Sequence, residues 1–328
     1  MWKKFRRMLK KNKFILTFVR VMKNAGENCP LVYHCRDYTQ NDLVRTMIKT
    51  LVTPYYALKW FVRRDIPGRE GLAFVLIAKN EATYIKEWLD FHIKQGVTHF
   101  FIYDNLSTDN FREVLQPYID SGMVTYSIIN RTNRQIDAYN MALHKYGKKF
   151  KYMAFIDGDE FVFVRKNPYC EGYSLYDFMN GFMKAHPKAG VLRIHWLMFG
   201  SSYHEKRPKG GVLKNFTMCA GKDFPSNCLT KFICDPLKIL AAGVHSAMCR
   251  RGSYCMNEIG KIINEGVPNE VNFEQIRINH YFCKSIEEYK AIKMGRGDVT
   301  FGKTVKLMEA FHALNSNDFT DTEILSRI

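Results

Sequence analysis

The chain has 328 residues, of which 46% are hydrophobic, so it is long enough for one large domain or two small ones with a substantial core. Its 49 Lys and Arg outnumber its 32 Asp and Glu, and the net charge of +17 indicates an acidic partner: nucleic acid, anionic lipid or a phosphorylated substrate. The nine cysteines form no C-x-x-C pair, which argues against a zinc ribbon or a disulfide scaffold and favours a reducing cytosol.

The first 13 residues carry seven Lys or Arg and no acid. On a helical wheel the apolar side chains of this segment fall on one side and the cations on the other, which predicts a helix lying on an anionic membrane surface through residues 1–20. A disordered basic tail and a nucleic-acid arm are the alternatives. The run Phe14–Met22 is shorter than the roughly 18 apolar residues of a span and contains Arg20, so we expect a peripheral protein on the cytoplasmic, inner face of a membrane rather than a signal anchor.

Residues 24–66 give mixed helical signals and no recognisable chemistry, and Ile66-Pro67-Gly68 marks a boundary. Beyond it, apolar strands alternate with helices. The expected strands are Leu72–Ala78, His99–Tyr103, Met123–Ile129 and a run ending at Asp157, and the expected helices lie between them, the third at Arg134–Tyr146. This alternation predicts an α/β fold with a doubly wound, mostly parallel sheet. Ligands of such sheets bind at the carboxyl ends of the strands, where the polar clusters of this chain fall.

Three carboxylates and one glycine, Asp157-Gly158-Asp159-Glu160, lie between two apolar runs. Asp157 and Asp159 are two residues apart, so in an extended backbone their side chains leave on the same side. Paired carboxylates suit Mg²⁺ or Mn²⁺ rather than a soft metal. Phe161 and Pro168 stand where an EF-hand loop needs ligands, which excludes that motif. A solvated turn between strands is the alternative interpretation.

Several short motifs occur in a fixed order between about Leu72 and Asp298. They are Lys79-Asn80-Glu81, Glu87-Trp88 to His92, Tyr103 to Asp109, Gln135 with Tyr139-Asn140, Ile156 to Phe161, His195-Trp196 to Ser201, Val244-His245, Asn279-His280-Tyr281 to Ser285, and Lys293 to Gly297. In this order they resemble glycosyltransferase family 92 and the related bacterial family-2-like glycosyltransferases of the GT-A fold. The resemblance implies three parts: an N-terminal helical segment (1–66), a glycosyltransferase domain (67–300) and a C-terminal helical tail (301–328).

The resemblance also implies an inverting, metal-dependent transfer of a sugar from a nucleotide donor, UDP-galactose being one candidate, to a cell-surface glycan or lipid-linked saccharide. A divalent metal would neutralise the diphosphate that leaves. The expected metal ligands are Asp157, Asp159 and His280, with His245 as a competitor for the last position. A buried histidine bonded to a carbonyl is the alternative for His280.

Donor and acceptor contacts are expected at three further places. Lys79, Asn80, Glu81, Asp104 and Gln135 would meet the nucleotide sugar, Lys284 and Arg296 the diphosphate, and His195 and Trp196 an acceptor sugar, which stacks on aromatic faces. The alternatives are turn and helix-cap chemistry for Asn80 and Asp104, a solvated helix face for Gln135, and core packing for the aromatic pair.

An inverting transferase also needs a general base for the acceptor hydroxyl. The candidates are Glu205, Asp223, Asp235, Glu258 and His245, and the sequence does not decide among them. We predict His245 as a catalytic residue, together with Asp157 and Asp159.

Two other functions compete with this one. A nucleotidyltransferase also uses paired aspartates on a similar sheet but releases pyrophosphate. A non-catalytic basic module would bind nucleic acid or anionic lipid with an affinity that falls steeply with salt.

Overall fold

The computed structural model describes residues 66–130, 134–263, 270–294 and 307–328, together with helical positions scattered between 47 and 59. The prediction for residues 1–20 lies outside the described residues, as does Arg296. Among the described residues, no helix combines the length and the apolar character that crossing a membrane requires.

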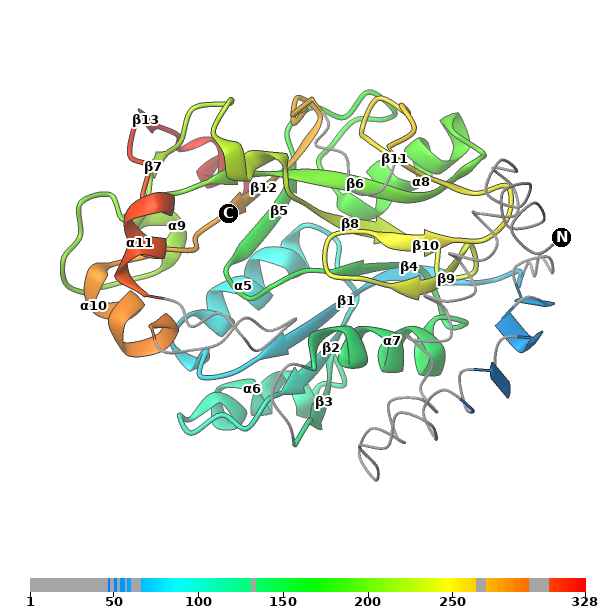
Figure 1. The fold of residues 1–328 in the computed structure, drawn as a ribbon, viewed down its shortest axis with the longest axis horizontal. Helices are drawn as coiled ribbons and strands as arrows, with labels where there is room; N and C mark the ends of the chain where they lie inside the picture. The colour runs from blue at the N-terminus through cyan, green and yellow to red at the C-terminus, as the bar shows by residue number, and fades with distance from the viewer. Residues whose placement is uncertain are drawn as a thin grey trace, which may run out of the picture.

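A nine-stranded mixed sheet forms the centre of the structure (Figure 1). Its order is β3 (Val124–Ile128), β2 (His99–Asp104), β1 (Glu70–Ala78), β4 (Phe150–Phe155), β8 (Thr230–Cys234), β6 (Ala189–Met198), β12 (Ile276–His280) and β5 (Glu160–Val164), with β11 (Tyr254–Met256) beside β6.

The strands β3, β2, β1 and β4 pair in parallel, whereas β8 runs antiparallel to both β4 and β6, and β5 runs antiparallel to β12. The α/β class and the largely parallel sheet are therefore confirmed, and the antiparallel β8 at its centre is a feature that was not predicted.

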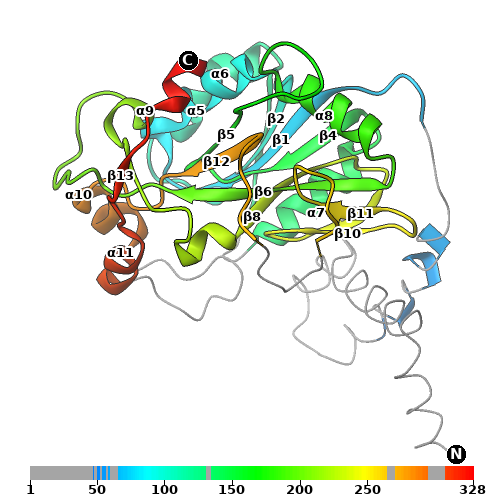
Figure 2. The same ribbon diagram turned by 90° about the horizontal axis from the view of Figure 1, so that it is seen from above.

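Helices cover both faces of the parallel half, as a doubly wound sheet requires (Figures 1 and 2). They are α5 (Ala82–Lys94), α6 (Phe111–Asp120), α7 (Gln135–Tyr146) and α8 (Leu175–Ala185). Alternate residues of β1 enter different cores: Phe74 packs with α5 residues such as Trp88, and Val75 packs with Tyr139 of α7. The near-continuous apolar run of β1 follows from burial on both faces.

The second half of the chain adds short elements around this sheet. They are α9 (Val212–Asn215), β7 (Met218–Cys219), η1 (Pro225–Cys228), the hairpin of β9 (Ile239–Ala242) and β10 (Ala247–Cys249), α10 (Ile286–Glu288) and η2 (Tyr289–Lys293). Asn140 of α7 joins β9 to the parallel half, because its side chain donates to the carbonyl of Ala242 at 2.7 Å and accepts from the amide of Ala242 at 2.9 Å.

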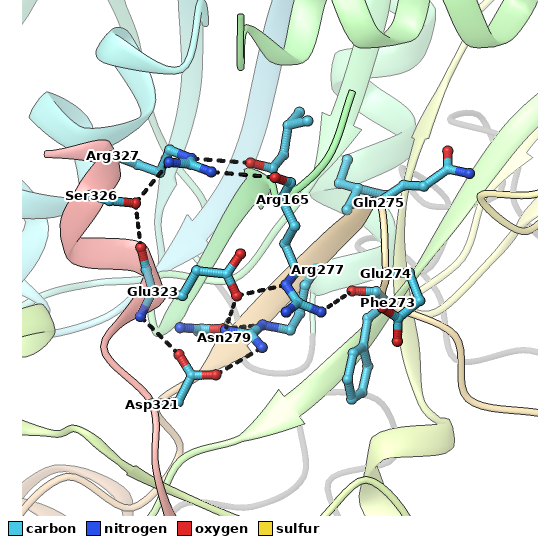
Figure 3. Close-up of polar contacts among 12 residues, drawn as sticks. Arg165, Phe273, Glu274, Gln275, Arg277, Asn279, Asp321, Glu323, Ser326 and Arg327 are labelled. Carbon is cyan, nitrogen blue, oxygen red and sulfur yellow. Dashed lines mark hydrogen bonds and ion pairs between the residues drawn. The ribbon is translucent and has the colours of Figure 1, made fainter. Parts of the chain in front are cut away.

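The C-terminal stretch contains α11 (Met308–Leu314), β13 (Phe319–Thr320) and η3 (Glu323–Arg327), so it is not purely helical. It is held to β12 by Arg277, whose buried guanidinium lies 2.9 Å from Asp321 and donates from Nε to Asn279 at 2.9 Å (Figure 3). Arg165 completes this contact with an ion pair to Glu323 at 2.7 Å. The C-terminus therefore braces β5, which follows the Asp-x-Asp turn, and β12, which ends at His280.

Candidate functional site

The parallel strands bring three polar loops to one edge of the sheet. In the register Ala78 pairs with Asp104, and Val75 pairs with Phe155, so β1, β2 and β4 end side by side. The loops that follow contain Lys79 to Glu81, Asn105 to Asp109, and Asp157 with Asp159. This edge is the expected ligand side of the sheet.

The loops after β1 and β2 are joined by hydrogen bonds. Asn80 has a φ of 55°, which an asparagine tolerates, and its Oδ1 accepts from the amide of Thr108 at 2.7 Å while its own amide donates to Ser107 Oγ at 2.9 Å. Asp104 is buried and accepts from the amide of Ser107 at 2.8 Å and from the Tyr126 hydroxyl at 2.5 Å. These bonds match the turn-chemistry alternative for Asn80 and Asp104, and a donor contact by either residue stays a prediction.

Asp157 is held by three buried side chains. Its Oδ1 accepts from Gln135 Nε2 at 2.6 Å and from the Tyr139 hydroxyl at 3.0 Å, and its Oδ2 lies 2.7 Å from Lys231 Nζ. Burial alone would lower the pKa of Lys231, but the carboxylates of Asp157 and Glu160 outweigh it and raise that pKa. Lys231 is therefore an ammonium, and it fixes the position of the Asp157 carboxylate.

Glu160 is fully buried beneath the turn. Its Oε2 accepts from the amide of Asp157 at 2.8 Å, and its backbone carbonyl accepts from the Trp88 indole at 2.7 Å. Burial raises the pKa of Glu160 well above its usual range, with Lys231 opposing this shift and the neighbouring aspartates adding to it. Glu160 thus supports the shape of the turn through its bond to the Asp157 amide.

Asp159 lies between a lysine and a histidine. Its Oδ2 forms an ion pair with Lys293, and its Oδ1 lies 3.5 Å from His280 Nε2. Burial would raise the pKa of Asp159, but Lys293 and His280 outweigh it and hold the pKa well below its usual range. Burial also lowers the pKa of His280, with Asp159 acting in the opposite direction. A carboxylate and a neutral imidazole therefore face each other.

The predicted metal shell of Asp157, Asp159 and His280 stays a prediction. Among the described residues, no group of three or more His, Cys, Asp and Glu side chains is arranged to hold a metal ion. Asp157 is turned toward Lys231, Gln135 and Tyr139 instead. Asp159 and His280 still fit a metal, because each is in its ligating protonation state and a divalent ion bound to a diphosphate needs only one or two protein ligands.

His195 and Trp196 were expected to form one wall, and the structure separates them. Neighbouring residues of β6 point to opposite faces of the sheet. The Trp196 ring lies at the site, with its centroid 4.2 Å from that of His280 and 5.4 Å from that of His245. His195 points away, and its Nδ1 lies 3.0 Å from the carbonyl of Asn272. Only Trp196 remains a candidate for the acceptor wall.

His245 is the one candidate base that this arrangement brings to the site. Burial, followed by the charge of Lys231, lowers the pKa of His245 to about 4, and Asp157 and His280 also act on it. Its Nδ1 lies 3.1 Å from the carbonyl of Thr230, and donation there leaves Nε2 as the acceptor. A neutral imidazole with a directed acceptor nitrogen has the form that a general base requires.

The carboxylate candidates lie elsewhere or already have structural partners. Asp235 lies 3.0 Å from Arg69, and it follows Cys234, which pairs with Met153, so it lies toward the start of β4 and away from Asp157. Glu258 accepts from three consecutive backbone amides, those of residues 274 to 276. Glu205 and Asp223 are exposed on loops.

Lys284 was expected to bind the diphosphate, and the structure places it beside the site in a left-handed conformation with a φ of 51°. Its ammonium lies 3.6 Å from Glu81 and 4.6 Å from the centre of the Tyr84 ring. Its charge also contributes to the low pKa of Asp159. Lys284 and Glu81, which are far apart in sequence, are thus joined at the edge of the sheet; the diphosphate contact stays a prediction.

Sequence reasoning gave no role to Lys231, Lys293 or Tyr139, although all three contact the aspartates. Lys231 begins the segment Lys231 to Pro236, in which Asp235 alone was a candidate, and Lys293 stands in the last of the motifs. A lone lysine inside an apolar strand, as in Thr230–Cys234, is the signal that points to a buried carboxylate partner.

The sequence profile of glycosyltransferase family 92 matches residues 75–295, well over half of the chain. The chain belongs to glycosyltransferase family 92. The matched residues include every cluster described above, from the end of β1 to Lys293. The prediction of this family is confirmed.

Relatives of this family 92 protein match shorter stretches. A glycosyltransferase family 92 protein of rice (Oryza sativa subsp. japonica) is 31% identical over 140 residues, which are 42% of this chain and 23% of the relative. A galactan beta-1,4-galactosyltransferase of Arabidopsis thaliana is 35% identical over 91 residues, 24% of this chain and 17% of that protein. Each match thus spans about a quarter or less of these relatives.

Solved structures overlap this family 92 chain only in part. TarS residues 1–349 of S. aureus in complex with UDP gives a TM-score of 0.34 at 16% identity, covering 51% of this chain and 47% of TarS. Glucosyl-3-phosphoglycerate synthase of Mycobacterium tuberculosis, crystallised with Mn²⁺ and UDP, gives 0.30 at 14% identity, covering 52% and 58%. TM-scores this low support no conclusion about this chain.

Proposed function

We propose that this protein is an inverting glycosyltransferase of the GT-A type that transfers a sugar from a UDP-sugar to a saccharide acceptor. The observation that carries the proposal is the Asp159 cluster, where one carboxylate faces His280 and Lys293 at the carboxyl edge of the sheet. Membership of family 92 supports the reaction class. The Arabidopsis galactosyltransferase supports UDP-galactose as the first donor to test and a saccharide or glycolipid as the acceptor.

The chemistry of the proposed reaction follows from the charges of the site. Transfer builds negative charge on the departing diphosphate, and stabilising that charge lowers the barrier. Asp159 and His280 would hold a divalent metal, Mn²⁺ or Mg²⁺, which neutralises phosphate oxygens when bound. Lys293 and Lys284 lie close enough to Asp159 to act on the same charge. Lys231 keeps Asp157 in place beside them.

On the acceptor side, Trp196 offers an apolar ring next to His245. A sugar ring stacked there would place a hydroxyl near the histidine, whose Nε2 would take the proton as the new bond forms. A base with a pKa of about 4 accepts protons weakly at neutral pH, so we expect a contribution near the lower end of the range, about a hundredfold in rate.

The cell location that we propose is the cytoplasmic face of a membrane, with residues 1–20 on the lipid surface. The support is the charge pattern of the sequence, seven cations and no acid in the first 13 residues. The product would then be a cell-surface glycan assembled from cytosolic donors.

The deciding experiment incubates the protein with UDP-, GDP- and CMP-sugars, with and without Mn²⁺, and identifies the released product. Release of UDP from a UDP-sugar supports the proposal, and NMR of the product anomer tests inversion. Release of pyrophosphate would identify a nucleotidyltransferase instead. Asp159→Asn is the matched variant, because it keeps the shape of the side chain while removing the charge: undiminished turnover of Asp159→Asn in excess Mn²⁺ would contradict the assigned role.

A further inference from the structure

A stripe of apolar side chains is exposed on the helical residues between 47 and 59. Met47, Leu51, Tyr55 and Leu58 are spaced by four, four and three residues, which places them on one side of a helix. They are 58%, 75%, 54% and 64% exposed. Tyr56, whose ring centroid lies 5.5 Å from that of Tyr55, is buried, with its centroid 6.4 Å from that of His144. Tyr56 thus contacts α7, whereas the four apolar side chains of the stripe are exposed.

A cationic hollow of about 400 Å³ lies at the end of the sheet where β1 begins. Its described lining includes five cationic residues and one acid, Arg69, Lys151, Lys238, Arg250, Arg251 and Asp235. The acid is committed to Arg69, with which it forms an ion pair at 3.0 Å. Lys238 donates to the carbonyl of Ala189 at 2.9 Å, which fixes its ammonium at the wall. Among the described lining residues, positive charges therefore outnumber negative ones.

The stripe and the hollow are continuous. Arg250, which lines the hollow, donates from Nη1 to the carbonyl of Lys59 at the end of the helical residues. The Lys59 ammonium lies 4.6 Å from the centre of the Tyr55 ring in the stripe. Figure 1 shows these helical pieces at the right, beside β9 and β10. One surface therefore combines exposed apolar groups with a site for an anion.

We propose that this surface docks on an anionic phospholipid bilayer, with the apolar stripe among the lipid chains near the headgroups and the hollow holding a headgroup phosphate. An isolated phosphate would use the cations but not the stripe. A bilayer uses both, because apolar burial and attraction of cations to anionic lipid add in surface-bound helices. The net charge of +17 favours the same partner. This proposal does not depend on the glycosyl transfer proposed above, nor on residues 1–20.

The orientation has a consequence for the acceptor. The hollow contains Arg69, just before β1, whereas the catalytic cluster follows the other end of that strand. Nine residues of strand span about 30 Å. Docked in this way, the protein holds its catalytic edge away from the lipid, which suits an acceptor sugar carried at the end of an extended saccharide.

The test measures partition of the full chain onto phosphatidylcholine vesicles and onto vesicles containing phosphatidylglycerol. The stripe variant is Leu51→Asn with Leu58→Asn, and the hollow variant is Lys151→Gln with Arg251→Gln. The matched control, Lys94→Gln with Lys222→Gln, removes the same charge from exposed positions outside the hollow. We expect partition onto anionic vesicles to fall roughly 30-fold in the hollow variant, since each cation near the surface is worth about fivefold. The stripe variant should lose on the order of tenfold, and the control much less than the hollow variant.

Several outcomes would overturn the proposal. A control that loses as much as the hollow variant would indicate diffuse attraction by net charge. Unchanged binding by either test variant would show that the surface is not used. Binding of free glycerol phosphate with equal vesicle partition in all variants would identify a soluble phosphate ligand, and a dimer that dissociates only in the stripe variant would identify a second copy as the partner. Thermal unfolding and donor hydrolysis should match the wild type throughout, which separates this result from any failure of the enzymatic proposal.

Discussion

Replacing Lys231 with methionine should lower the free energy of unfolding and leave the side chain of Asp157 without a fixed position. Lys231 Nζ is fully buried, 2.7 Å from Asp157 and 3.9 Å from Glu160. Removing one partner of a buried ion pair costs about 3–5 kcal/mol, because the other charge is left without compensation. Asp157 keeps 31% exposure and two hydrogen-bond donors, so we place the loss of unfolding free energy near the lower end, at about 3 kcal/mol.

The assay is urea unfolding of four proteins: wild type, Lys231→Met, Asp157→Asn and the double variant. Neutralising Asp157 in the Lys231→Met background should recover about 1–2 kcal/mol, since the unpaired carboxylate is then gone. The matched control is Lys86→Met. Lys86 pairs with Asp90 at 2.5 Å, but both side chains are exposed, so we expect a loss of at most about 0.5 kcal/mol.

Two results would refute this account of Lys231. One is a Lys231→Met protein as stable as the Lys86→Met control. The other is strict additivity of Lys231→Met and Asp157→Asn, because independent sites show no coupling. Donor hydrolysis gives a second measure: it should fall in Lys231→Met and stay unchanged in Lys86→Met.

Three further predictions follow from the site and the core. His280→Ala should raise the Mn²⁺ concentration needed for donor hydrolysis, while His245→Ala should lower the rate of transfer with little change in that requirement; the reverse pattern would move the metal to His245. Deleting residues 1–20 should weaken binding to anionic vesicles and leave donor hydrolysis intact, and full vesicle binding by the truncated protein would contradict the role of this segment. Burial lowers the pKa of His92 from 6.5 to about 3. As the pH is lowered from 6.5 to 3, the unfolded chain therefore binds a proton that the folded chain does not, and the free energy of unfolding should fall by about 1.4 kcal/mol per pH unit. Urea unfolding of His92→Gln should show a shallower pH dependence than the wild type, whereas the exposed His312→Gln should not.

The parallel half of the fold was predictable because local signals there agree with the tertiary structure. The strand at Leu72–Ala78 is apolar throughout, and the helix after it has buried residues at helical spacing, among them Trp88 and His92. Both patterns arise from burial against the sheet, so periodicity reveals them. The antiparallel β8 was missed because a five-residue apolar strand carries no information about its direction or its neighbours.

The site was predictable by residue type but not by partner. The carboxyl-edge rule brought Asp157 and Asp159 together with the loops after β1 and β2, because that rule depends only on strand order. It did not reveal that Asp157 pairs with Lys231, which is 74 residues away. Nor did it separate His195 from Trp196. Their opposite orientations follow only once both residues are placed in one regular strand, where neighbouring side chains point to opposite faces.

The ion pairs of the site give a reason why the proposed reaction would need a metal. Lys231 pairs with Asp157, Lys293 with Asp159, and Lys284 with Glu81, so each of these ammonium groups already faces a carboxylate. In the proposed reaction a diphosphate beside them would add negative charge that these lysines offset only in part, because each of them also balances a carboxylate. Buried carboxylates left without cations are costly. Asp159 and His280 would resolve this conflict, because together they offer an oxygen and a neutral nitrogen to an additional cation bound with the donor. On this reasoning the lysines set the resting geometry of the aspartates, and a metal held by Asp159 and His280 would supply the positive charge that the diphosphate needs.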